Sequence, residues 1–237
     1  TSGRSIRGGI PICWPWSGPH PDDPRKPGHG FARHRVWQLD HVAGNEQATE
    51  LEFSLPPSPE LQSLWPHNFK LTFKVTVAAS LRMELITSNI DARPMEISSA
   101  LHSYFSVSDI SDISIDGLDE ILFRDALNED RICKQCGPIR FHSELDRVYH
   151  DTGNDILIND HVFDRRIRVQ KRGSRSTVVW NPWIEKSARL GDMPEGSYRQ
   201  MVCVESANAD HNRLSLLSGE SHRLFTEISS EAITGGC

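Results

Sequence analysis

Apolar and polar residues alternate along much of the chain, most clearly over residues 69–77. Apolar side chains stand there at every odd position, from Phe69 to Val77, and most even positions carry Lys or Thr. A period of two residues is the pattern of a β-strand that buries one face. The sequence therefore predicts a strand over 69–77.

Shorter runs of the same character recur and are separated by turn-forming residues such as Asp116-Gly117 and Gly153-Asn154. The runs lie at 37–42, 51–55, 81–90, 110–115, 156–158, 167–169, 177–180, 202–204 and 224–228. This spacing favours an antiparallel β-sandwich over alternating strands and helices. No linker or internal repeat divides the chain, so we predict a single β domain over residues 1–237.

Helix is predicted to be scarce. The best candidate covers residues 58–65, with Ser58 as N-cap and Pro59 at the first helical position. Residues 8–33 and 179–196 are rich in Gly, Pro and Trp, and we predict both to be loops. Long irregular segments inside a compact β domain usually carry binding function.

Charge and hydropathy exclude two classes of partner. The chain has 26 Lys and Arg residues against 32 Asp and Glu, a formal net charge of −6, whereas binding to a phosphate backbone needs a clustered basic surface. No apolar run approaches the ~20 residues of a membrane-spanning helix. We therefore expect neither nucleic acid nor a membrane as a partner.

The cysteines indicate a reducing compartment. They are odd in number and unevenly spaced, so we predict free thiols, at Cys13, Cys133, Cys136, Cys203 and Cys237. Cys133 and Cys136 have the spacing of a zinc knuckle, but no second ligand pair follows at a suitable interval. With no secretory signal in the first residues, we expect a cytoplasmic protein.

The common motifs of cofactor chemistry are absent. The sequence contains no GxGxxG or GxxxxGK[ST] glycine motif, no GxSxG nucleophile elbow and no HExxH metal motif. What remains are ionisable residues inside apolar strand segments, where burial without a purpose is costly. Glu205 follows Val202 and Val204 on the opposite strand face, and His102 shares a face with Tyr104. Each also fits an ordinary role, Glu205 as a solvated residue at a strand end and His102 as a hydrogen-bonded core residue.

Other candidates are Arg7, His29, Arg33 and Asp146. His29 and Arg33 belong to one loop segment, His29-Gly30-Phe31-Ala32-Arg33. The two arginines fit surface charges equally well, and Asp146 could pair with its neighbour Arg147 for ~0 to 1 kcal/mol.

Taken together, seven blocks resemble, in this order, the hexose-6-phosphate mutarotases of the aldose 1-epimerase superfamily, which are glucose-6-phosphate 1-epimerases. The blocks are 7–16 (RGGIPICWPW), 29–33 (HGFAR), 101–105 (LHSYF), 146–149 (DRVY), 180–182 (WNP), 191–193 (GDM) and 202–205 (VCVE). The match extends from Arg7 to about Leu224.

The resemblance implies an all-β, largely antiparallel galactose-mutarotase-like β-supersandwich with few short helices. It implies an isomerase without cofactor or metal that interconverts the α and β anomers of hexose 6-phosphates, and we expect a monomer. Two alternatives remain: a mutarotase for unphosphorylated aldoses, and a non-catalytic carbohydrate-binding protein.

The resemblance also implies roles for the candidate residues. Glu205 matches the general base and His102 the general acid, while His29 and Asp146 match residues that hold sugar hydroxyls. Arg7 and Arg33 match arginines associated with the phosphate. Ring opening needs removal of the proton from the C1 hydroxyl and delivery of a proton to the ring oxygen, and a carboxylate with an imidazolium suffices.

The sequence departs from the family in two places. It begins almost at Arg7, where relatives carry several more strands, so we expect the first part of the sandwich to be absent from this chain. Ser17 stands where relatives usually place an aromatic residue, which would loosen that wall of the pocket.

Overall fold

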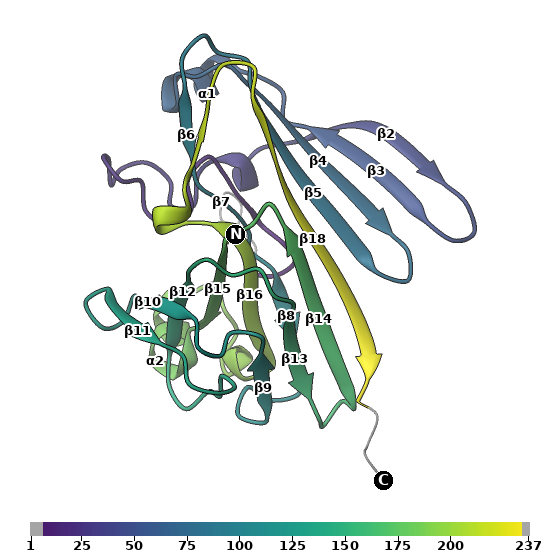
Figure 1. Ribbon diagram of the computed structural model, residues 1–237, viewed down its shortest axis with the longest axis vertical. Helices are drawn as coiled ribbons and strands as arrows, with labels where there is room; N and C mark the ends of the chain where they lie inside the picture. The colour runs from purple at the N-terminus through teal and green to yellow at the C-terminus, as the bar shows by residue number, and fades with distance from the viewer. Residues whose placement is uncertain (1–6, 234–237) are drawn as a thin grey trace.

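Two large antiparallel β-sheets build the protein, as a computed structural model that describes residues 7–233 shows (Figure 1). The first sheet has the order β1-β7-β16-β15-β12-β10-β11, with β8 also paired to β16. Its strands are β1 (Ile12–Cys13), β7 (Ser99–Leu101), β8 (Tyr104–Ser106), β10 (Leu122–Asp125), β11 (Arg131–Lys134), β12 (Leu145–Tyr149), β15 (Ser176–Asn181) and β16 (Met201–Asn208).

The second sheet has the order β2-β3-β4-β5-β18-β14-β13-β9. Its strands are β2 (Gln38–Gly44), β3 (Thr49–Ser54), β4 (Phe69–Val77), β5 (Leu81–Asn89), β9 (Ile113–Asp116), β13 (Ile156–Asp160), β14 (Arg165–Arg172) and β18 (Ser221–Ala232). A small two-stranded sheet joins β6 (Met95–Ile97) to β17 (Leu214–Leu216). The prediction of an antiparallel all-β fold is confirmed, and each predicted run overlaps a strand.

One helix agrees with the prediction and one corrects it. In α1 (Pro59–Leu64), Ser58 caps the N-terminus, since its Oγ accepts a hydrogen bond from the Leu61 amide at 3.2 Å. The prediction of a loop over 179–196 is wrong, because α2 (Trp183–Leu190) lies within it. Its first amide donates to the Asn181 side chain, and Gly191 ends it in the left-handed conformation at φ 64°.

Three short 3-10 helices complete the regular structure: η1 (Ala32–His34), η2 (Ser197–Gln200) and η3 (Asp210–Asn212). Residues 8–33, predicted as a loop, hold only β1 and η1. Figure 1 shows β2–β5 extending at the upper right, away from β10–β12 and α2 at the lower left.

The main apolar core lies between the two sheets. Val202 and Val204 of β16 face it together with residues of β13 and β14, such as Ile158 and Val169. A second cluster packs Trp14 and Phe31, among others, against β4 and β5. Because Val202 and Val204 point into the main core, alternation turns the side chains of Cys203 and Glu205 to the other face of the first sheet.

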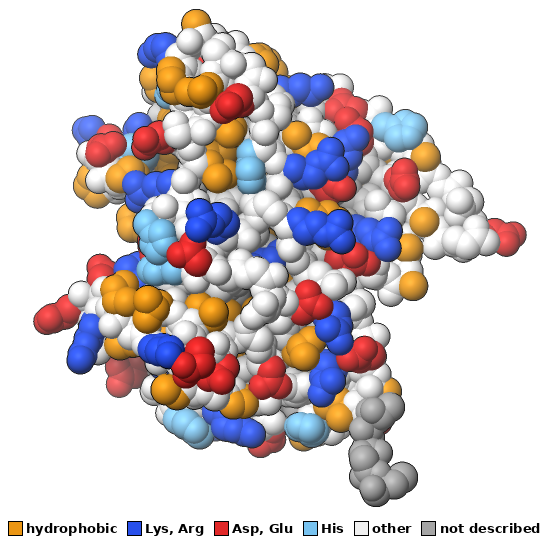
Figure 2. Space-filling view, viewed as in Figure 1, with side chains coloured by type: hydrophobic (Ala, Val, Ile, Leu, Met, Phe, Trp, Pro, Cys, Tyr) orange, Lys and Arg blue, Asp and Glu red, His pale blue; other side chains and the backbone are white. Residues whose placement is uncertain are grey.

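The outer surface carries mixed charge. Figure 2 shows Lys, Arg, Asp and Glu side chains interspersed over one face of the molecule. The second sheet has cross-strand ion pairs, including Lys74 with Glu52 at 2.8 Å and Arg223 with Glu84 at 2.9 Å. Exposed pairs of this kind each contribute little to stability, about 0 to 1 kcal/mol.

Candidate active site

An interruption between β7 and β8 places His102 beside Glu205. Both strands pair with β16, β7 with residues 206–208 and β8 with residues 201–203. The chain between them leaves the sheet for two residues, and its backbone is held there by hydrogen bonds. The His102 amide donates to the Pro11 carbonyl at 3.0 Å, and the Ser103 carbonyl accepts from the Val204 amide at 3.2 Å.

The two side chains approach each other in a buried position. His102 Nδ1 lies 3.2 Å from Glu205 Oε1, and the residues are 6% and 3% exposed. Nδ1 makes no hydrogen bond to any residue of the described chain. The imidazole stacks on the Tyr104 ring, with centroids 4.9 Å apart and planes inclined by 6°. The ring is therefore fixed in place while its nitrogen remains available.

Burial favours the neutral form of both groups. It lowers the pKa of His102 to about 3, and the nearby charges of Arg33 and Arg7 act in the same direction. It also raises the pKa of Glu205 well above the usual range, with Asp146 adding to the rise and Arg33 opposing it. A neutral imidazole with a carboxylic acid has the same total number of protons as an imidazolium with a carboxylate. The two states differ only in which of the two groups holds one proton.

These residues line a cavity of about 430 Å³ on the open face of the first sheet. Of the residues that the sequence predicted for the site, Arg7, His29, His102, Asp146 and Glu205 all border this cavity. They come from segments far apart in the sequence. Ser17 belongs to the lining as well, and its amide donates to Ser98 Oγ at 2.9 Å.

His29 lies next to His102 in the lining of the cavity, with ring centroids 5.7 Å apart. Its Nδ1 accepts a hydrogen bond from the Gly18 amide at 3.3 Å and lies 3.5 Å from Cys13 Sγ. Burial lowers the pKa of His29 to about 4, and Arg33 and Arg7 contribute. His29 is therefore neutral at pH 7.

Asp146 lies on β12, where it pairs in register with Trp180 of β15. Burial raises its pKa, and the charges of Lys186 and Arg124 oppose the rise. A partly desolvated carboxylate that faces a cavity is a strong hydrogen-bond acceptor for hydroxyl groups.

The two predicted arginines differ in their surroundings. Arg7 borders the cavity, and its Nε donates to both carboxylate oxygens of Asp192 at 3.1 and 3.2 Å. Arg33 lies outside the lining of this cavity and borders a neighbouring groove with Gly8. Its Nη2 donates to the Gly28 carbonyl at 2.9 Å, and its buried Nε has no hydrogen-bond partner among residues 7–233.

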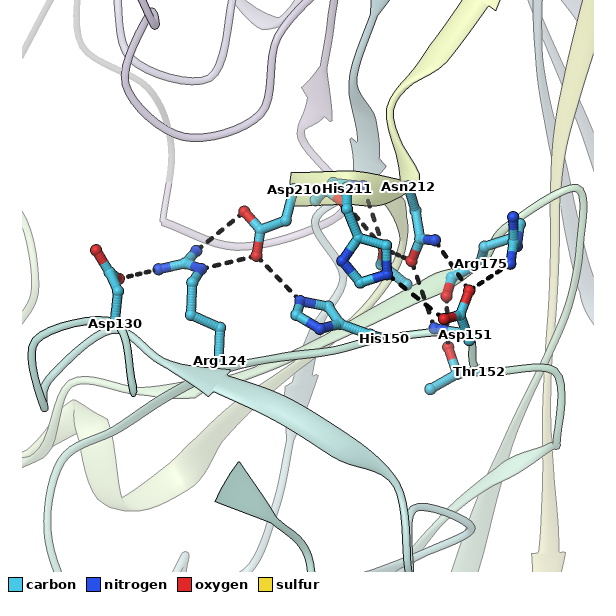
Figure 3. Close-up of polar contacts among 11 residues, drawn as sticks. Arg124, Asp130, His150, Asp151, Thr152, Arg175, Asp210, His211 and Asn212 are labelled. Atoms are coloured by element: carbon cyan, nitrogen blue, oxygen red, sulfur yellow. Dashed lines mark hydrogen bonds and ion pairs between the residues drawn. The ribbon is translucent and has the colours of Figure 1, made fainter. Parts of the chain in front are cut away.

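A polar network that the sequence did not predict contributes Arg124, Asp130 and Asp210 to the lining of the cavity (Figure 3). Arg124 of β10 contacts Asp130 and donates two hydrogen bonds to Asp210, at 2.7 and 3.3 Å. Asp210 Oδ2 also lies 3.3 Å from His150 Nε2. Arg124 and Asp210 are 86 residues apart. No local motif contains them, so the sequence offered no signal.

The same network continues away from the cavity around Asp151 (Figure 3). Asp151 contacts Arg175, accepts a hydrogen bond from Asn212 Nδ2 at 3.1 Å and lies 3.4 Å from His211 Nε2. These contacts join η3 to the loops that follow β12 and precede β15. The wall that carries Arg124 is thereby held at several points.

The described residues hold no cluster of three or more His, Cys, Asp or Glu side chains that could bind a metal ion. Cys13, Cys133, Cys136 and Cys203 are free thiols, and Cys237 lies outside the described residues. Within residues 7–233, none of the helices has the length and apolar character needed to cross a membrane.

Comparison with known proteins connects this geometry to one group. The sequence profile of the family described as aldose 1-epimerase matches residues 1–229. Relatives with the name "Putative glucose-6-phosphate 1-epimerase" match most of the chain. The protein from Cenchrus ciliaris is 35% identical over 93% of this chain and 69% of its own length. The protein from Escherichia coli K12 is 36% identical over 90% of this chain and 70% of its own length.

A solved structure is similar over nearly the whole chain. The crystal structure of a protein from Salmonella typhimurium described as a "putative mutarotase (YeaD)" superimposes with a TM-score of 0.90 at 33% identity. The superposition covers 98% of this chain and 77% of the other.

Proposed function

Because the chain belongs to the aldose 1-epimerase family, it is an isomerase that interconverts sugar anomers, and we propose that it acts on hexose 6-phosphates with Glu205 and His102 as the proton-transferring pair. The observation that carries this proposal is the 3.2 Å approach of His102 Nδ1 to Glu205 Oε1 inside the cavity. The C1 hydroxyl oxygen and the ring oxygen are bonded to the same carbon. A base and an acid that serve both oxygens must therefore lie close together.

Glu205 takes the proton of the C1 hydroxyl and His102 gives a proton to the ring oxygen. Ring opening then leaves Glu205 protonated, His102 neutral and the sugar as an aldehyde. Rotation about the bond from C1 to C2 followed by the reverse transfers closes the ring on the other face. The chemistry requires no metal or nucleotide.

The buried position of the pair supports this cycle. Desolvation favours the neutral acid and the neutral imidazole, which is the state reached when the ring is open. The attraction between opposite charges at 3.2 Å favours the ion pair that precedes opening. Because the two effects oppose each other, the proton can move in either direction at modest cost.

His29 and Asp146 line the cavity with the pair and fit the binding of sugar hydroxyls. His29 offers a donor, and Asp146 offers an acceptor whose affinity for hydrogen bonds is strengthened by burial. We assign to these two residues the orientation of C1 against Glu205.

The distribution of charge favours the Arg7 side of the cavity for the phosphate. The part of the lining around Arg124 holds three carboxylates, Asp130, Asp146 and Asp210, against two cations, Arg124 and Lys186, so its balance of charge disfavours an anion. Arg33 has no carboxylate partner among the described residues, and its charge reaches Glu205 and both histidines. Arginine suits phosphate because its planar guanidinium can donate two hydrogen bonds to one phosphate group.

Two observations favour the second candidate, a mutarotase for unphosphorylated aldoses. Arg7 is neutralised by Asp192, and Arg33 lies outside the lining of the cavity. We also propose that the chain acts as a monomeric single domain, with a site lined by residues from distant segments of the chain. The free thiols support a reducing, cytoplasmic location.

Magnetisation-exchange NMR of glucose 6-phosphate and glucose anomers tests the proposal. We expect the protein to accelerate exchange of the phosphate ester more than that of glucose, and Arg33→Ala to remove most of this preference. Equal acceleration of both sugars, unchanged in Arg33→Ala, would favour the second candidate. Tight binding without acceleration would indicate a carbohydrate-binding protein.

A further inference from the structure

The cavity contains two imidazoles, and their nitrogens have different surroundings. His102 Nδ1 makes no hydrogen bond within residues 7–233. His29 Nδ1 lies within hydrogen-bond distance of two groups, the Gly18 amide at 3.3 Å and the Cys13 thiol at 3.5 Å. A thiol is a weak donor, and hydrogen bonds that involve sulfur are longer than those between nitrogen and oxygen, so 3.5 Å is a suitable distance.

The Gly18 amide favours one position of the His29 proton, through a hydrogen bond that is long at 3.3 Å. A backbone N–H can only donate, so Nδ1 must offer a lone pair to it. The Cys13 thiol must then also act as donor, because Nδ1 has no hydrogen to give. Burial raises the pKa of Cys13 far above its usual value, so the thiol keeps its hydrogen. The proton of the neutral ring consequently lies on Nε2.

We propose that Cys13 is a positioning residue for His29: with the Gly18 amide, its thiol fixes the Nε2–H form of the ring, which then donates a hydrogen bond to the bound sugar. The last step of this inference rests on the proposed function. The fixed proton also separates the roles of the two histidines. His29 can donate but has no basic nitrogen free, whereas His102 can exchange its proton.

The backbone holds this arrangement firmly. The His29 amide donates to the Gly18 carbonyl at 2.6 Å, so the two residues are joined by main-chain and side-chain hydrogen bonds. Gly30 has φ 72°, and a Cβ there would lie only 2.0 Å from the carbonyl oxygen of Trp14. Trp14 follows Cys13 directly, and its carbonyl accepts from the Phe31 amide at 3.0 Å. The loop with His29 is thus pressed against the strand with Cys13.

The first test measures the proton position directly. Nitrogen-15 NMR of the histidine rings distinguishes a protonated from an unprotonated nitrogen. In the wild-type protein we expect His29 to show a protonated Nε2 and an unprotonated Nδ1 from pH 5 to pH 8. In Cys13→Ala we expect a measurable share of the other tautomer, and in Cys13→Ser, which keeps a donor, the wild-type pattern.

The second test measures turnover of glucose 6-phosphate. Loss of one weak hydrogen bond predicts that kcat/KM of Cys13→Ala falls roughly 2- to 10-fold, with recovery in Cys13→Ser. His29→Gln keeps a donor near Nε2 and should retain more activity than His29→Asn. Cys136→Ala removes an exposed thiol and serves as the control with unchanged activity.

The outcomes separate the two proposals. A His29 tautomer that is the same in wild type and Cys13→Ala would overturn the positioning role, whatever the activity. A tautomer that depends on Cys13 in a protein without epimerase activity would retain the role of Cys13 and reject the proposed function. Circular dichroism confirms that each variant is folded, so that loss of structure is not mistaken for either result.

Discussion

Two buried ionisable residues, Lys171 in the second sheet and His102 beside the first, differ in how their nitrogen atoms are hydrogen-bonded. Lys171 of β14 is 8% exposed, and its Nζ donates to Thr152 Oγ1, to Ser174 Oγ at 3.2 Å and to the Ser176 carbonyl at 2.9 Å. All three hydrogens of an ammonium group have partners there. His102 is as deeply buried, yet its Nδ1 has no hydrogen bond within the described chain.

The difference separates a structural role from a chemical one. Buried polar groups are normally hydrogen-bonded, because an unpaired group costs about 1–3 kcal/mol. Lys171 follows this rule, and it does not belong to the lining of the cavity that contains His102. His102 departs from it where a cavity opens beside Glu205, as we expect of a nitrogen that exchanges a proton with the substrate in the proposed reaction. We expect substitutions at the first centre to change stability and those at the second to change turnover.

The largest expected effect is that of Glu205→Gln. The amide keeps the shape of the side chain but cannot accept the proton, so kcat should fall roughly 10²- to 10⁴-fold. The free energy of unfolding should change little, since a buried acid is replaced by a neutral group. NMR exchange rates and urea unfolding measure the two quantities. Activity above one tenth of wild type would remove Glu205 from the base role.

Lys171→Met should reverse this pattern. The substitution leaves acceptors at Thr152, Ser174 and Ser176 without their donor, which costs about 1–3 kcal/mol of unfolding free energy. Turnover per folded molecule should remain that of the wild type. Urea unfolding combined with anomer exchange makes the comparison. A drop in kcat at unchanged stability would show that the two centres are not separate.

The sequence predicted the strands better than the walls of the site. Alternation predicted strand β4. It also predicted the face on which Glu205 lies, because Val202 and Val204 face the core and Glu205 must then point to the other side of the strand. Helix α2 was missed because the surrounding segment is rich in Gly and Pro. Residues 183–190 themselves contain neither, and Gly191 marks the end of the helix.

The site was predicted only where its residues belong to recognisable blocks. His102 and Glu205 stood out as ionisable residues in apolar strands, and the resemblance added Arg7, His29, Arg33 and Asp146. Arg124 and Asp210 have no such context, because their contact depends on how β10 and η3 meet in the folded chain. Long-range pairing of this kind leaves no periodic pattern in the sequence.

The pH dependence of stability should also distinguish the two centres. Burial lowers the pKa of Lys171 to about 7 in the folded state, against about 10.4 when unfolded. Between these values the unfolded chain binds more protons, so this group makes stability rise with pH by up to about 1.4 kcal/mol per unit. The slope from pH 7 to pH 9 should therefore be lower in Lys171→Met. Identical slopes would mean that Lys171 keeps its proton in the folded protein.

A smaller effect is expected from Asp210→Asn. The amide weakens the ion pair with Arg124 and the contact with His150, which loosens this part of the cavity lining. KM for glucose 6-phosphate should change about 2- to 10-fold, while kcat stays near wild type, because the proposed proton-transferring pair is untouched. Asp151→Asn, in the outer part of the same network, serves as the matched control. A change confined to kcat would place Asp210 in the chemistry instead.

The smallest expected effect is a nearly flat dependence of kcat/KM on pH. In the proposed reaction Glu205 and His102 share one exchangeable proton. The pair takes up a second proton only at low pH and loses the shared proton only at high pH. The pKa of His102 is lowered to about 3 and that of Glu205 is raised, so the working state persists as pH falls well below 6.5. Between pH 5 and pH 7, kcat/KM should change less than about 2-fold.

The substrate must be chosen so that it does not titrate in this range. A phosphate ester loses its second proton near pH 6, about the middle of the window, whereas a sulfate ester keeps one charge throughout. Glucose 6-sulfate therefore isolates the ionisations of the protein, and glucose 6-phosphate adds those of the substrate. An acid limb near pH 6.5 with the sulfate ester would mean that His102 titrates like an exposed histidine, and the contrast with the fully bonded Lys171 would lose its basis.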